Sequence, residues 1–179
     1  RNPVSDRRFR QMSEKVLPAQ ASVVELSNAG RIMVPPPTFN AMYLIVHIVT
    51  HFISGGVGLR QICDWARLVH ISAADLDRNE LEEMIDKTRY KRPVGAFAAI
   101  AVDYLGLPEA DSPIILTNED RQNTRILIDD ILQMGNFGQH NSLADRSYAG
   151  YWKTRWRNYK QSIKRSWRFR FLSPSETGW

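Results

Sequence analysis

Apolar residues recur along most of this chain at the three- and four-residue spacing of amphipathic helices. The segment from Thr38 to about Ile53 is apolar almost all round, which is typical of a helix buried on most sides. Thr38 is the expected N-cap of this helix. A short N-terminal helix is expected through about Val16, ended by Pro18, and further helices are expected at 59–69, 76–90, 94–105, 118–134 and 148–171. The pattern therefore predicts a mainly α fold, a bundle of about six helices.

A small β-hairpin is predicted near the N-terminus. Ser22–Leu26 and Arg31–Val34 are short β-type runs, and Asn28-Ala29-Gly30 between them has turn chemistry. Three consecutive prolines, Pro35–Pro37, close this unit. We therefore expect an N-terminal helix and hairpin over 1–37, a helical core domain over 38–144, and a basic helix and tail over 145–179 that packs on the core.

Charge is distributed unevenly along the chain. Residues 144–179 carry nine Lys or Arg against two acids, a balance of +7, while the other 143 residues carry 15 basic and 17 acidic groups, a balance of −2. The basic character thus belongs to the C-terminal segment, and such asymmetry is typical of a segment with an anionic partner.

Composition also bears on the cellular compartment. The chain has a single cysteine, Cys63, so an internal disulfide is excluded and a cytoplasmic protein is the simplest expectation. Cys63 is expected on the apolar face of the 59–69 helix, as a core residue. The longest apolar run is too short to span a bilayer, so no transmembrane segment is expected.

The sharpest candidate site is formed by two pairs of residues with helical spacing. His47 and His51 are four residues apart and so lie on one helical face, and Arg60 and Asp64 repeat this spacing on the next helix. A glycine-rich turn, Ser54–Gly58, could fold the two helices back and bring all four side chains together. Three readings follow. The groups satisfy one another in a helical core, they contact a ligand or phosphate, or two imidazoles and a carboxylate hold a metal. A metalloprotease is not indicated, because Ile48 follows the first histidine.

The same segment resembles a known family. His47-x-x-x-His51-Phe52, the Gly55–Gly58 turn and the run from Leu59 to Ala66 are similar to the signature of the uncharacterised nucleotidyltransferase family found in bacteria, and the resemblance extends from about Asn2 to Leu107. These proteins resemble DNA polymerase β-type nucleotidyltransferases, with a catalytic α/β half followed by a helical half. The resemblance implies that this chain, which begins at Arg1, is the helical half and lacks an upstream nucleotidyltransferase half.

That resemblance implies a nucleotide-binding role without a complete catalytic set. Nucleotidyltransferases hold Mg²⁺ and a nucleoside triphosphate with paired carboxylates on a strand. Asp75-Leu76-Asp77 has a suitable spacing, but it precedes a helix, where acids serve as caps, so no catalytic residue, metal ligand or cofactor is assigned to this chain. Instead, His47, His51, Arg60 and Asp64 would line a cleft facing the missing half. Arg60 is the natural phosphate contact, because its planar fork matches phosphate oxygens.

The basic C-terminal helix gives an alternative function. Tyr151–Phe171 carries eight Lys or Arg and no acid, and five residues form an apolar, mostly aromatic stripe at steps of four, three, four and four: Trp152, Trp156, Tyr159, Ile163 and Trp167. Lys153, Arg157, Lys160 and Lys164 could contact a nucleic acid, an acidic protein or an anionic membrane. We favour packing of the stripe on the core, because three exposed tryptophans would promote aggregation. A non-enzymatic anion-binding module remains the alternative to the nucleotidyltransferase reading.

Overall fold

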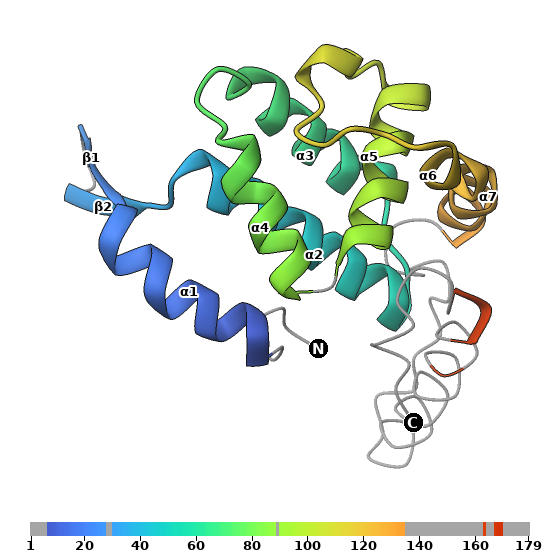
Figure 1. Cartoon of the computed structure of the whole chain (residues 1–179), viewed down its shortest axis with the longest axis horizontal. Helices are drawn as coiled ribbons and strands as arrows, with labels where there is room; N and C mark the ends of the chain where they lie inside the picture. Colours follow the sequence, from blue (N-terminus) through green and yellow to red (C-terminus); the bar gives the residue numbers. More distant parts are fainter. Residues whose placement is uncertain (1–6, 28–29, 89, 135–162, 164–166, 170–179) are drawn as a thin grey trace.

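Helix α2 (Pro37–Gly55) packs against several other helices, as its nearly all-round apolar surface requires. The computed structural model describes residues 7–27, 30–88, 90–134, 163 and 167–169. Within these ranges it is mainly α-helical with one antiparallel hairpin, so the predicted fold class is confirmed (Figure 1). The other elements are α1 (Arg7–Gln20), β1 (Ser22–Leu26), β2 (Gly30–Val34), α3 (Leu59–Ile71), α4 (Arg78–Thr88), α5 (Lys91–Leu105), the 3₁₀ helix η2 (Glu109–Asp111), α6 (Asn118–Gln122) and α7 (Thr124–Met134).

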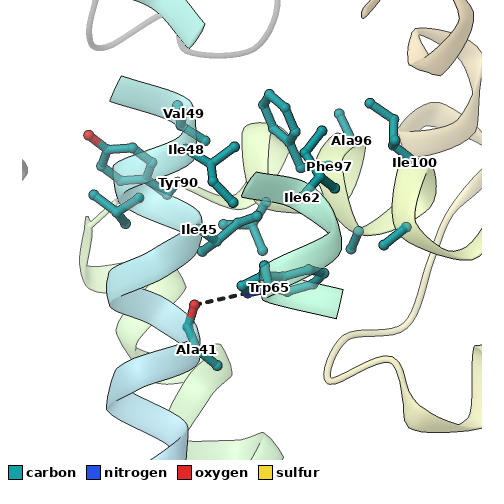
Figure 2. Packing of buried hydrophobic residues seen from close by; sticks show 14 of the residues in the cluster. Ala41, Ile45, Ile48, Val49, Ile62, Trp65, Tyr90, Ala96, Phe97 and Ile100 are labelled. Atoms are coloured by element: carbon teal, nitrogen blue, oxygen red, sulfur yellow. Dashed lines mark hydrogen bonds between the residues drawn. The ribbon is translucent and has the colours of Figure 1, made fainter. Parts of the chain in front are cut away.

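The core lies where α2 meets α3, α4 and α5. Trp65 of α3 is almost completely buried, and its indole N–H donates to the carbonyl oxygen of Ala41 on α2 at 3.0 Å (Figure 2). Ile45 and Ile48 of α2 and Phe97 of α5 belong to the same buried cluster. This hydrogen bond satisfies the indole nitrogen, the one polar atom of the largest buried side chain. The packing of α2 on α3 therefore combines apolar contact with a hydrogen bond that fixes the position of Trp65 along α2.

The hairpin projects from one end of the molecule and is not part of the core (Figure 1). Its strands pair from Ser22 with Val34 to Leu26 with Gly30, and Gly30 adopts a positive φ of 80°, which suits the turn. All ten residues are exposed except Val34, which is half-buried. A Glu25–Arg31 ion pair at 2.9 Å joins the strands. The predicted hairpin is therefore confirmed, with little covering it in the part of the chain that the structure describes.

Several helix ends differ from the predictions. The first helix continues through Pro18 to Gln20, because proline removes only one backbone donor and the Ala21 N–H still reaches the carbonyl of Leu17. Thr38 does not cap α2, which begins at Pro37 with Pro36 as its N-cap. The Thr38 hydroxyl instead accepts a hydrogen bond from the Asp77 N–H at 3.0 Å and so ties the start of α2 to the start of α4.

The predicted 118–134 helix is two helices, α6 and α7, separated at Asn123. Thr117 caps α6, because its hydroxyl accepts a hydrogen bond from the Asp120 N–H at 3.3 Å. In return, the Thr117 hydroxyl and N–H donate to the Asp120 carboxylate at 2.7 and 2.8 Å. That carboxylate lies directly against Gly95 of α5, where a Cβ atom would collide with it. Glycine at position 95 is therefore what allows α6 to approach α5 so closely.

Four residues of the C-terminal segment are described, and one of them is part of the core. Phe169 is 2% exposed, and its ring meets that of Phe52 at 4.6 Å in an edge-to-face geometry. Arg168 lies 3.3 Å from the buried carboxylate of Asp130 on α7. Trp167, a member of the predicted buried stripe, is instead 61% exposed. Among these four described residues, Phe169, which lies outside that stripe, is the one buried in the core.

Candidate functional site

Four ring-bearing side chains follow one stripe of α2 at four-residue intervals, and we refer to them as the ring row: Phe39, Tyr43, His47 and His51. Neighbouring rings along the row are 6.5, 6.1 and 4.3 Å apart between centroids. The first two pairs are nearly parallel, at 26° and 17°, while the two imidazoles meet edge to face at 66°. The i, i+4 spacing of a helix is what places these rings in one line.

The two ends of the ring row differ in their surroundings. At the first end, Phe9 of α1 is fully buried and packs on Phe39 and Tyr43, at 5.8 and 6.0 Å. At the other end, His47 and His51 are half-buried in the last two turns of α2. The row therefore passes from the core to a partly accessible surface.

Both imidazoles favour the neutral form. Burial lowers the pKa of His47 below its ordinary value, and the Nδ1 atom of this side chain is buried without a hydrogen-bond partner in the described structure. Burial likewise lowers the pKa of His51, and the neighbouring His47 charge lowers it further. Because a charged imidazole needs solvation for both N–H groups, this pair is uncharged at neutral pH.

Arg60 and Asp64 form the second predicted pair, on α3. Their side chains are 87% and 65% exposed and approach each other at 4.0 Å, the geometry of a loose surface ion pair. The buried face of α3 is formed by Ile62, Trp65, Ala66 and Val69, and Arg60 and Asp64 lie on the opposite, solvent-facing side of the helix. Cys63 is also exposed, so its predicted place in the core is wrong.

The structure thus keeps the four predicted residues as two pairs on different faces. The glycine-rich turn does fold α3 back against α2, and Gly56 adopts the positive φ of 97° that this reversal requires. However, α3 presents its apolar face to α2, so Arg60 and Asp64 point away from the histidines. The pairs nevertheless share one end of the molecule, in the last turns of α2 and the first turns of α3.

The metal reading of these residues is not supported. Within the described ranges, no group of three or more His, Cys, Asp or Glu side chains could hold a metal ion. His47, His51 and Asp64 all lie in those ranges, so they do not form the three-ligand set that the sequence suggested.

In the acidic pair Asp75 and Asp77, the second residue serves the start of the helix that follows. Asp77 accepts a hydrogen bond from the Glu80 N–H at 3.0 Å, one turn into α4. The prediction that this carboxylate acts as a cap is therefore confirmed.

Two features of the structure were missed at the level of sequence. One is the ring row: the spacing of Phe39 and Tyr43 in the sequence already extends the histidine pair into a row, but the sequence does not show that Phe9 covers its first end. The other is that His70 bonds Asp111 of η2 at 2.6 Å and joins two segments 41 residues apart. The alternative anion-binding residues, Lys153, Arg157, Lys160 and Lys164, lie outside the described residues.

Comparison with known families identifies the family of the chain. The family model described as uncharacterised nucleotidyltransferase matches residues 1–106. The chain belongs to this nucleotidyltransferase family. No curated protein and no solved structure matches it. The matched region contains both predicted pairs and ends one residue beyond α5. In the described part of this family member, no helix is long and apolar enough to cross a membrane.

Proposed function

We propose that this chain is the helical part of a nucleotidyltransferase-like protein and contributes to binding the nucleotide or the acceptor. The observation that carries the proposal is the family match over residues 1–106, which includes the His47–His51 and Arg60–Asp64 pairs. Both pairs lie at the end of the molecule where α2 turns into α3, so one extended ligand could touch the two faces.

Arg60 is well suited to contact a phosphate group. Arg60 forms an ion pair with Asp64, and an ion pair between two side chains that are mostly exposed contributes about 0–1 kcal/mol. The guanidinium can therefore exchange this carboxylate for phosphate oxygens at little cost, and the planar fork matches their geometry. Neutral imidazoles, by contrast, add no charge at His47 and His51.

The catalytic carboxylates are proposed to come from outside this chain, in an upstream half of the full-length protein. Asp77 is engaged as the cap of α4, which leaves the Asp75–Asp77 pair unsuited to hold Mg²⁺. Under this proposal, Mg²⁺ and the reacting phosphates of a nucleoside triphosphate are held by the upstream half, and this chain alone is inactive. A cytoplasmic location fits this proposal.

Calorimetry with ATP and Mg²⁺ tests the proposal on this 179-residue chain and on a version extended upstream of Arg1. We expect binding by the extended protein and about a tenfold loss of affinity with Arg60→Ala, the size of a charge-assisted hydrogen bond. Arg67→Ala is the matched control, because Arg67 is also exposed on α3 and its loss removes the same charge.

Two results would count against this function. Equal losses with Arg60→Ala and Arg67→Ala would mean that only the general field of the protein attracts ATP. Absence of nucleotide binding by both lengths of the protein would limit the family relationship to the fold.

A further inference from the structure

The β1–β2 hairpin is a part of the fold that the nucleotide contacts described above do not use. Its ten paired residues are all exposed except Val34, which is half-buried. Among the described residues, none from the hairpin belongs to the core cluster or packs against it. A two-stranded hairpin is marginally stable in water unless a further strand or a cover on an apolar face supports it. The hairpin is therefore a candidate for contact with a further surface.

The two faces of the hairpin differ in chemistry. Paired residues of antiparallel strands point to the same face, and successive pairs alternate between the faces. One face, which we call the apolar hairpin face, carries no charged side chain: Ser22, Val24, Leu26, Gly30, Ile32 and Val34. On the opposite face, the Glu25–Arg31 ion pair lies beside the Val23–Met33 pair. Because the two charges neutralise each other, the hairpin has no net charge to attract an anionic ligand.

The connection to α2 fixes the direction of the hairpin. After Val34, Pro35 and Pro36 lead directly to Pro37, the first residue of α2. Proline restricts φ to a narrow range, so this connection holds the hairpin in one orientation. The hairpin projects from one end of the molecule (Figure 1). The apolar hairpin face is thus preformed, and a contact with it costs little conformational entropy.

The size of the apolar hairpin face indicates which kind of partner it fits. Its three most exposed apolar side chains, Val24, Leu26 and Ile32, are 41%, 43% and 43% exposed. The face therefore offers on the order of a few hundred Å² of accessible apolar surface. A specific complex between separate proteins buries about 800 Å² on each partner. This face alone would not hold a second copy of the chain, whereas a covalently linked partner needs less area because the link raises its effective concentration.

We propose that the apolar hairpin face is the docking surface for the upstream half of the full-length protein. This inference rests on the proposed function, which assigns the catalytic carboxylates to that half. The hairpin follows α1, whose 14 residues span about 20 Å, so an upstream half joined before α1 lies within reach. Its contacting surface is apolar and uncharged, because the hairpin face offers no charge to pair with.

The position of the hairpin also fits a role in orienting the upstream half. The hairpin leads into the first turn of α2, whereas His51 lies near the end of this helix and Arg60 follows in the first turn of α3. The 19 residues of α2 span about 28 Å, close to the diameter of a small domain. One domain docked on the hairpin is therefore large enough to reach the end of the molecule where the proposed nucleotide contacts lie.

Single cysteines at neighbouring positions test the docking. In a Cys63→Ser background, which removes the one native thiol, Ile32→Cys places a thiol on the apolar hairpin face and Met33→Cys places one on the opposite face. The rate of maleimide modification is measured on the 179-residue chain and on the version extended upstream of Arg1. We expect Ile32→Cys to react about tenfold more slowly in the extended protein, and Met33→Cys to react within about threefold of one rate in both.

A second variant measures the same contact without a label. Ile32→Ser removes apolar surface from the hairpin face, so it should lower the urea midpoint of the extended protein and leave that of the 179-residue chain nearly unchanged. Circular dichroism of each variant establishes that it folds. An equal change of the urea midpoint at both lengths would contradict the docking.

Three modification results would overturn the docking. Equal rates for Ile32→Cys at both lengths would mean that the face stays open. Slow modification in the 179-residue chain itself would mean that residues of this chain cover the face, and protection that grows with protein concentration would assign the face to a second copy. ATP calorimetry on the same extended protein keeps the two proposals apart. Nucleotide binding with an open face retains the proposed function and rejects the docking, whereas a protected face without nucleotide binding retains the docking and rejects the nucleotide role.

Discussion

Replacement of Phe169 by alanine tests whether the end of the chain is part of the folded core. The ring is 2% exposed and packs edge to face on Phe52, which itself packs on Phe97 of α5 at 5.5 Å. Loss of a buried phenylalanine side chain costs about 3–5 kcal/mol, from lost apolar burial and from the cavity that remains. Against a typical total stability of about 5–15 kcal/mol, Phe169→Ala should remove a large share.

Urea denaturation followed by circular dichroism measures this loss directly. Arg168→Ala is the neighbouring comparison: its side chain is 56% exposed, but removal of its ion pair takes one charged partner from the Asp130 carboxylate, which is 4% exposed, and should cost about 1–3 kcal/mol. Phe169→Leu keeps most of the apolar volume and should cost less than Phe169→Ala. A cost below about 1 kcal/mol for Phe169→Ala would refute the packing of this ring on α2.

Three further predictions concern other parts of the fold. Gly95→Ala should destabilise the protein by about 1–3 kcal/mol despite the better helix propensity of alanine, because the new Cβ collides with the Asp120 carboxylate. The double variant Gly95→Ala/Asp120→Ala should recover most of the lost stability, as measured by thermal denaturation. Asp77→Ala should cost about 1 kcal/mol by removing the cap of α4, whereas Asp75→Ala should change stability by less than about 0.5 kcal/mol; a larger effect at Asp75 would contradict the capping assignment. As pH falls below 6.5, the native protein should lose stability relative to the double variant His47→Phe/His51→Phe. The folded-state pKa values of both histidines are lowered, so the unfolded chain binds protons first. If the urea midpoints of the two proteins shift equally between pH 7.5 and 5, these histidines are not buried.

The sequence predicted the elements of this fold better than their ends. Apolar periodicity located α2, α3 and α5, because each buries one or more faces in the same core. It could not show that the helix passes through Pro18, since the lost hydrogen bond is only one among several in that turn. Thr38 has the right chemistry for a cap, but tertiary packing gives its hydroxyl to the backbone of Asp77 instead.

The candidate site was predicted only in part for a similar reason. Spacing within one helix is a local property, so the neighbourhood of His47 and His51 followed from the sequence. Whether side chains on two different helices come together depends instead on which faces of the helices pack against each other. The burial of Trp65 turns Arg60 and Asp64 outward, and nothing local to Arg60 encodes that rotation. Phe169 was missed because its ring partner, Phe52, lies 117 residues away in the chain (169 − 52).

The position of Phe169 also shows that the region matched by the family is shorter than the region that folds around one core. The family match stops at residue 106, yet buried side chains of the same core continue beyond it, at Leu107, Leu127, Ile128, Ile131 and Phe169. A polypeptide cut at the family boundary would keep the recognisable signature and leave the apolar surfaces of α2 and α5 open to water. The residues after 106 therefore belong to the same folding unit as the matched region, because they cover apolar side chains that the matched region leaves exposed.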